Sequence, residues 1–188
     1  PWQLYAVGTA MGERLRLSDT SWNECTSRWS PEGNRMVFVS ERDGNREVYV
    51  MDLTAWLAGE REPLNLTDHK APDWQPAWSP TGERIAFSSY RDDNWEIYMV
   101  DADGSDLVRV TDHPESDISP TWSPDGSQLL FVSRRKGDAD LFVKDLGSGA
   151  YTQLTTGPLD EFDPAWSPDG AWVAFVTQIG AQGDVFVM

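Results

Sequence analysis

The sequence is poor in cysteine, histidine and basic residues. Its single cysteine, Cys25, can form neither an intrachain disulfide nor a thiolate metal cluster. Its two histidines, His69 and His113, lie 44 residues apart, and the chain contains no Cys-x-x-Cys, His-Glu-x-x-His or Gly-x-Ser-x-Gly motif. These absences argue against a metal centre and against the common hydrolase signatures, so we expect no catalytic residue, no metal and no cofactor.

Basic residues number 15 against 31 acidic ones, which gives a net charge of −16 and a pI near 4.3. The resulting field repels phosphate backbones and anionic lipid, so we expect no nucleic acid and no membrane among the partners. A basic protein or peptide, or a cation, fits this field better, although the acids can equally serve solubility alone. The longest apolar runs have about four residues, as at 129–132, and no segment is predicted to insert into a membrane.

Tryptophan, by contrast, is abundant, with ten residues in 188, and four of them open a repeated motif. The motif is Trp-Ser-Pro-x-Gly, and it begins at Trp29, Trp78, Trp122 and Trp166, with spacings of 49, 44 and 44 residues. We assign the five extra residues of the first spacing to a loop insertion at 54–60. A period of 44 residues indicates an array of supersecondary units.

Each copy of the repeat predicts four short strands. Its apolar runs are short and rich in β-branched and aromatic residues, as at 84–88, 96–100 and 107–111, and no window of eleven residues shows helical periodicity. Ser-Pro-x-Gly supplies turn residues after the first strand. The predicted fold class is therefore all-β, a β-propeller of four-stranded antiparallel blades, because repeated blades packed around an axis leave only short edges exposed.

We assign residues 1–188 to a single propeller domain, with a partial blade at 1–20, blades at 21–68, 69–112 and 113–156, and a partial blade at 157–188. The chain begins and ends in the third strand of a copy. Residues 13–17 could supply the fourth strand of the last copy and close a four-bladed ring. The third strand would then occur twice in one blade, which favours four repeats within a larger ring, or a ring completed by self-association.

The repeat resembles the TolB-type, WD-like propeller repeat. The resemblance is carried by Leu-Thr at 66–67, Pro-Ala-Trp-Ser-Pro at 76–80, Ala-Phe-Ser-Ser at 86–89 and Ile-Tyr-Met-Val-Asp at 97–101. A similar series recurs between residues 154 and 187, and the resemblance covers nearly the whole chain. It implies a periplasmic or extracellular protein of bacteria, with partners bound on a propeller face or in the axial channel.

Four carboxylates recur five residues before each motif tryptophan, and these candidate binding residues are Glu24, Asp73, Asp117 and Glu161. The first strand of a blade lines the channel, so they could form an acidic ring at its mouth, suited to a cation or a basic peptide segment. The alternative, which we favour, is that each pairs with an arginine 13 residues after the tryptophan. Those arginines are Arg42, Arg91 and Arg135. The last copy has Ile179 instead, which leaves Glu161 most free to bind a ligand.

A second set of acids precedes the third strand of each copy, and its members are Glu47, Glu96, Asp140 and Asp184. Because they recur in every copy, we expect them to form hydrogen bonds between strands rather than to bind a ligand. His69 and His113 occupy the same repeat position. We therefore expect them in loops of different blades, and neither at a shared metal nor as a catalytic base.

Two functions are consistent with these features. The first is a non-catalytic, TolB-like propeller that acts as a protein-binding or peptide-binding scaffold through its acidic channel and one loop face. The alternative is the propeller, or gating, portion of a larger prolyl-oligopeptidase-like or tricorn-like serine peptidase. A catalytic site within the channel is disfavoured because no histidines cluster and no basic channel residue is predicted.

Overall fold

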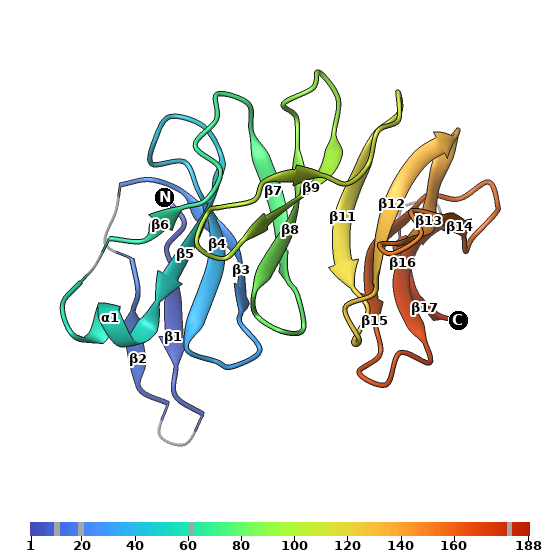
Figure 1. Ribbon diagram of the computed structural model, residues 1–188. Coiled ribbons are helices and arrows are strands. Elements are labelled where there is room, and N and C mark those ends of the chain that lie inside the picture. Colours follow the sequence, from blue (N-terminus) through green and yellow to red (C-terminus); the bar gives the residue numbers. More distant parts are fainter. Residues whose placement is uncertain (10–11, 19–20, 61, 180–181) are drawn as a thin grey trace.

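The fold is a row of antiparallel β-sheets that follow one another along the chain. The computed structural model describes residues 1–9, 12–18, 21–60, 62–179 and 182–188, and each of its five sheets is built from strands consecutive in sequence. Figure 1 shows the sheets side by side in an arc, with the N-terminus at one end and the C-terminus at the other. The predicted all-β propeller of four-stranded antiparallel blades is confirmed.

Three complete blades are flanked by two smaller sheets. The first sheet holds β1 (Tyr5–Val7) and β2 (Arg14–Arg16). The second holds β3 (Glu24–Trp29), β4 (Arg35–Ser40), β5 (Glu47–Asp52) and β6 (Leu64–Asn65), and the third holds β7 (Asp73–Trp78), β8 (Arg84–Ser89), β9 (Glu96–Asp101) and β10 (Val108–Arg109). The fourth holds β11 (Asp117–Trp122), β12 (Gln128–Lys136), β13 (Asp138–Asp145) and β14 (Tyr151–Gln153), and the fifth holds β15 (Glu161–Trp166), β16 (Val173–Ile179) and β17 (Gln182–Val187).

The four-bladed closure through residues 13–17 is not formed. That segment contains β2, which pairs with β1 in the register Ala6 opposite Leu15. Within the described residues, β17 pairs with β16 alone. The physical reason is that β1 occupies the third-strand position of its own copy, so the strand that follows it in sequence, β2, pairs with it across a short hairpin and is not available to the last copy.

In the three complete blades, the central strands are buried on both faces because each blade lies between two other sheets. In β8, Ile85, Ala86 and Phe87 are all fully buried, without the alternation of a half-exposed strand. The apolar core is divided into four clusters, one between each pair of neighbouring sheets. The cluster between the second and third sheets contains both Val39 of β4 and Phe87 of β8. A blade is therefore stabilised by its neighbours rather than by a core of its own.

The insertion after β5 forms a short helix, so the loop predicted at 54–60 was wrong over most of its length. The helix α1 spans Leu53–Leu57. The side chain of Asp52 caps its N-terminus by accepting a hydrogen bond of 3.0 Å from the main-chain nitrogen of Ala55. Trp56 is buried in the cluster between the first two sheets, and this burial holds a helix too short to be stable alone.

The Trp-Ser-Pro-x-Gly turns lock neighbouring blades together as well as closing hairpins. Within one turn, Ser79 Oγ accepts a hydrogen bond of 3.0 Å from the main-chain nitrogen of Arg84, and the nitrogen of Gly82 donates to the Ser79 carbonyl at 3.0 Å. In the next turn, Gly126 has a φ of +73°, and a Cβ there would lie 3.3 Å from Cγ of Pro80. The glycine therefore serves both a left-handed turn and a close approach between blades.

Candidate functional site

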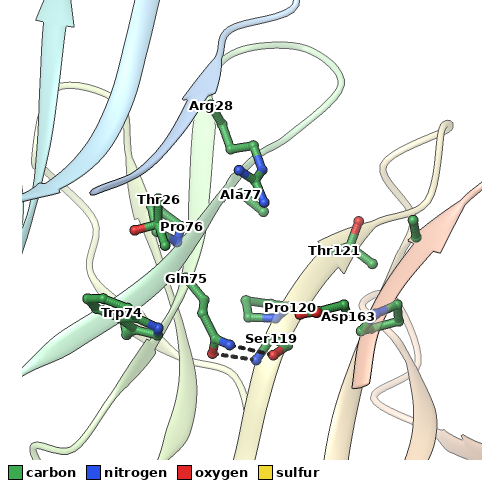
Figure 2. Close-up of a pocket in the computed structure, with 12 residues that line it drawn as sticks. Thr26, Arg28, Trp74, Gln75, Pro76, Ala77, Ser119, Pro120, Thr121 and Asp163 are labelled. Atoms are coloured by element: carbon green, nitrogen blue, oxygen red, sulfur yellow. Dashed lines mark hydrogen bonds between the residues drawn. The ribbon is translucent and has the colours of Figure 1, made fainter. Parts of the chain in front are cut away.

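An open pocket of about 610 Å³ lies between the inner strands β3, β7, β11 and β15. These are the first strands of four successive sheets, and each contacts the next along the row. Figure 2 shows side chains from all four strands around this space. The volume lies within the range of ligand pockets in proteins, so we treat this axial pocket as the candidate site.

Four residues reach the axial pocket because every inner strand carries a β-bulge at the same repeat position. The register of the inner strand shifts there in all four sheets. One residue in each bulge has a positive φ: 48° at Thr26, 53° at Gln75, 57° at Ser119 and 47° at Asp163. Such a conformation is uncommon outside glycine, asparagine and aspartate, and its recurrence in all four inner strands shows that the bulge is a regular feature of the blade.

This bulge was not among the features predicted from the sequence. A signal was present, because three of the four bulge residues are followed by a proline within the strand: Pro76, Pro120 and Pro164. Proline cannot donate to a ladder of hydrogen bonds, and inside sheets it is confined to edges and bulges. In the described part of the chain, each inner strand is the terminal strand of its sheet and pairs with one neighbour alone, which explains why proline is tolerated there.

Gln75 ties two of these strands together across the pocket floor. Its Nε2 donates a hydrogen bond of 2.7 Å to Ser119 Oγ, and its Oε1 accepts from the main-chain nitrogen of Ser119 at 3.1 Å. The hydroxyl of Ser88 also donates to Oε1, at 3.1 Å. The amide is thus held in one orientation by partners on β8 and β11, and both of its polar atoms are engaged before any ligand arrives.

Two charged side chains line the axial pocket, Arg28 of β3 and Asp163 of β15. The expectation of no basic channel residue was therefore wrong. Both side chains are exposed. Arg28 donates through Nη1 to the carbonyl of the adjacent Ser27 at 3.0 Å, and the carboxylate of Asp163 has no hydrogen-bond or ion-pair partner within the described ranges.

Three of the predicted carboxylates lie in the interior, against the predicted arginines. The distances between nitrogen and oxygen are 2.6 Å for Arg42 with Glu24, 3.4 Å for Arg91 with Asp73 and 2.7 Å for Arg135 with Asp117. The carboxylate side chains are fully buried and the arginines nearly so. The predicted pairing is confirmed. These acids do not line the axial pocket, and their direct contact with a ligand stays a prediction.

Each of these arginines also stacks on aromatic rings of its own blade. The guanidinium carbon of Arg135 lies 5.5 Å from the ring centre of Phe131, 4.8 Å from that of Phe142 and 4.5 Å from that of Tyr151. Arg42 and Arg91 lie in the same way over the rings of β4 and β5 and of β8 and β9. A buried cation held by a carboxylate and by ring faces is a structural support of the blade.

Burial raises the pKa of Asp73 and the pKa of Asp117 above the ordinary value of an aspartate. Hydrogen bonds from Ser89 to Asp73 and from Ser133 to Asp117, together with the paired arginines, lower each pKa but do not offset the effect of burial. One oxygen of each carboxylate has no hydrogen-bond partner in the described part of the chain. The removal of these charges from water is therefore only partly compensated.

Glu161 is the member of the set without an arginine. It is buried, and its Oε2 accepts a hydrogen bond of 2.9 Å from the hydroxyl of Thr155. Burial raises the pKa of the Glu161 carboxyl, and the nearby negative charges of Asp140 and Asp160 raise it further, while the bond from Thr155 lowers it. The side chain of Ile179, which takes the place of the arginine in sequence, lies outside the described residues. Ligand binding by Glu161 stays a prediction.

The second set of acids forms hydrogen bonds between strands, as expected, at three of its four positions. The partners are Asn65 for Glu47 at 2.6 Å, Arg109 for Glu96 at 3.2 Å and Gln153 for Asp140 at 2.9 Å. Each partner lies on the fourth strand of the same blade. Asp184 of β17 is exposed, and the sheet that contains it has no fourth strand among the described residues.

Both histidines lie in loops between blades, as predicted. The Nδ1 atom of His69 accepts from the main-chain nitrogen of Ala71 at 3.1 Å, and that of His113 accepts from Glu115 at 3.0 Å. No group of three or more histidine, cysteine, aspartate or glutamate side chains suited to a metal ion is found in the described ranges. Those ranges also contain no helix that is long and apolar enough to span a membrane.

Four-stranded antiparallel sheets, arranged in sequence order with their first strands around an axial pocket, define the chain as a β-propeller. The model of the TolB beta propeller domain matches residues 2–116 and 110–188. The chain therefore belongs to the TolB β-propeller domain family, and the resemblance found in its repeats is confirmed. Comparison with curated protein sequences gives no match.

Solved structures share the fold at low sequence identity. TolB from Acinetobacter baumannii superposes with a TM-score of 0.85 and 23% identity, over 98% of this chain and 45% of that one. A putative TolB from Agrobacterium tumefaciens gives 0.82 and 21%, over 99% and 69%. A puromycin-hydrolysing peptidase from Mycobacterium tuberculosis gives 0.78 and 18%, over 98% and 32%. The chain thus spans less than half of the Acinetobacter protein, and the likeness concerns the propeller fold.

Proposed function

We propose that this propeller is a non-catalytic scaffold that holds a peptide, or a segment of a protein partner, in the axial pocket. The observation that carries the proposal is the pocket itself, whose floor is fixed in advance by the bonds of Gln75 to Ser88 and Ser119. A site held rigid before binding loses less conformational entropy when the ligand arrives. Each of the four inner strands is the terminal strand of its sheet among the described residues, so main-chain groups on its outer edge that are not already bonded to a neighbouring blade could align an extended peptide.

Charge supports a basic partner. The chain carries a net charge of −16, which attracts cationic segments within about a Debye length and repels nucleic acid. The TolB-type family supports a periplasmic or extracellular location for this encounter. The loops between blades lead directly into the inner strands β7, β11 and β15, and we propose that they contribute the outer part of the binding face.

The experiment selects peptides from a displayed random library on the immobilised protein and measures their affinity by calorimetry. We expect the selected peptides to bind in the axial pocket, so that Ala165→Trp, which fills the pocket from its exposed β15 wall, weakens binding at least tenfold. The matched control is Ala150→Trp, at an exposed position of the hairpin between β13 and β14. Failure to enrich any peptide, or equal binding to both variants, would contradict the proposal.

A second candidate is the gating propeller of a larger serine peptidase. Its support is the superposition on the mycobacterial puromycin-hydrolysing peptidase, of which the matched part is 32%. Under this proposal the pocket would admit a substrate rather than retain a partner. Reading the gene on both sides of the present sequence tests it, because a Gly-x-Ser-x-Gly followed by aspartate and histidine would favour the peptidase, and further propeller repeats alone would favour the scaffold.

Self-association to complete a ring is a separate proposal. Trp29, the first motif tryptophan, is 48% exposed, whereas Trp78 and Trp122 are each 9% exposed between blades. Light scattering on the purified chain gives its mass in solution. A dimer that dissociates in Trp29→Ser would support pairing through this surface, and a monomer at all concentrations would oppose it.

A further inference from the structure

The axial pocket carries one positive and one negative side chain at its two ends. Arg28 lies on β3 and Asp163 on β15, the first and last of the four inner strands around the pocket, with β7 and β11 between them. Figure 2 shows Arg28 and Asp163 well apart, on different strands. They also differ in height along the channel, since Arg28 directly precedes its motif tryptophan and Asp163 stands three residues before its own.

Both charges are available to a ligand. Asp163 is exposed and has no partner within the part of the chain that the structure describes, and its backbone, with a φ of 47°, directs it from the bulge into the pocket. Arg28 uses Nη1 on the carbonyl of Ser27, which leaves its other guanidinium nitrogens without a protein acceptor in the described ranges. Each side chain therefore presents a hydrated charged group that could form an ion pair with an oppositely charged group of a ligand when the water is displaced.

The wall between the two charges is neutral and already satisfied. Gln75 and Ser119 bond to one another, and the remaining lining from β7 and β11 consists mainly of proline, alanine and threonine. A third charge on the ligand would find no partner along this wall. The wall instead fits an uncharged stretch of main chain or small side chains.

We propose that the axial pocket selects a peptide segment with two opposite charges, a cationic group held by Asp163 and an anionic group held by Arg28, separated by an uncharged stretch. This inference rests on the proposed function and deepens it by naming the ligand chemistry. It differs from simple attraction of a basic partner by the acidic surface, because a purely basic segment would place a positive charge against Arg28. Charge complementarity of this kind sets orientation and specificity more than raw affinity.

The test uses acetylated and amidated peptides that carry one lysine and one glutamate separated by one to four serine or alanine residues, in both orders. Peptides with two lysines, two glutamates or two glutamines at the same spacing complete the set. Calorimetry at low and high salt measures binding to the full chain. We expect one spacing and order to bind at least tenfold more tightly than its two-lysine, two-glutamate and two-glutamine counterparts.

Two variants probe the ends separately, each with a matched control. Asp163→Asn removes the charge and keeps a residue that tolerates a positive φ, and Arg28→Gln removes the opposite charge from an exposed side chain. Each should weaken the preferred peptide about tenfold. The controls are Asp93→Asn, an exposed aspartate that also has a positive φ of 68°, and Arg14→Gln, an exposed arginine of β2. Neither lines the axial pocket, and both should bind normally.

The outcomes separate this inference from the function on which it rests. If peptides bind and Ala165→Trp blocks them, but Asp163→Asn and Arg28→Gln bind as well as the unchanged chain, the scaffold stands and the two-charge ligand is wrong. If the two-lysine peptide binds best and Arg28→Gln does not weaken it, surface attraction alone accounts for binding and the inference is overturned. If no peptide of any composition binds, the proposed function fails with it.

Discussion

The indole nitrogen of Trp122 donates a hydrogen bond of 3.1 Å to the carbonyl oxygen of Ala77, on the inner strand of the preceding blade. Trp78 makes the equivalent bond to the carbonyl of Arg28 at 3.2 Å. The repeated tryptophan thus reaches across the blade boundary with its polar atom while its ring fills the core between the sheets. The indole nitrogen of Trp166 is buried without such a partner among the described residues.

Trp122→Phe should lower the free energy of unfolding by about 1–2 kcal/mol, because it keeps most of the buried ring and leaves the Ala77 carbonyl without its donor. Urea unfolding followed by circular dichroism measures this. The control is Trp29→Phe, at the same repeat position but 48% exposed, where a change below about 0.5 kcal/mol is expected. Equal losses in both variants would show that the bond between blades is unimportant.

Arg135→Met should destabilise the chain by about 3–5 kcal/mol, because it leaves the buried Asp117 carboxylate without its cation and removes the stack on three rings. The control is Arg134→Met, whose ion pair with Asp160 is 2.9 Å long but partly exposed to water, and a loss of at most about 1 kcal/mol is expected there. Urea unfolding measures both losses in free energy of unfolding, and similar losses for the two variants would contradict the prediction.

Glu161→Gln should stabilise the chain at pH 7 and lose this advantage as the pH falls. Burial and nearby aspartates raise the folded-state pKa of Glu161 above its ordinary value of 4.5. The folded state then binds this proton more tightly than the unfolded state, so the ionised carboxylate opposes folding above the folded-state pKa, and the opposition disappears below pH 4.5. We expect a rise in melting temperature of about 2–4 °C at pH 7 and none near pH 4.

Asp160→Asn is the counterpart with the opposite sign. The main-chain nitrogen of Ala139 and the side chain of Arg134 hold the pKa of Asp160 below its ordinary value. Its ionised form therefore favours folding above the unfolded-state pKa, and Asp160→Asn should lower the melting temperature at pH 7. A shift in the same direction for both variants would contradict the assignment.

Gly126→Ala should cost more stability than Gly33→Ala. Both glycines have a φ near +73°, at 73° and 74°, so alanine is strained by about 1 kcal/mol at either. A Cβ at Gly126 would also press against Pro80 of the preceding turn, whereas one at Gly33 would meet open space. The excess for Gly126, expected at about 0.5–1 kcal/mol in urea unfolding, measures the contact between blades. Equal losses of stability in Gly126→Ala and Gly33→Ala would show that the neighbouring turn shifts to accommodate the added methyl group without cost.

The blade could be predicted from sequence because its signals are local and repeated. Trp-Ser-Pro-x-Gly places a turn after each first strand, and the 44-residue period fixes the succession of sheets. The ion pairs of Glu24, Asp73 and Asp117 were also predictable, since an acid is followed by an arginine 18 residues later in three of the four copies. The helix α1 was not, because five residues are too few to show a period and their order depends on burial of Trp56.

The sequence by itself determined the propeller class, the strand succession, the turns and the pairing of buried acids with arginines, because each depends on contacts within one repeat. Only the tertiary structure decided which residues face the axial pocket. The bulges turn Thr26, Gln75, Ser119 and Asp163 inward, so that the charged residues lining the pocket are Asp163 and Arg28 rather than the four predicted carboxylates. Those two residues belong to different blades, and their relation depends on how sheets pack side by side, which no single repeat encodes.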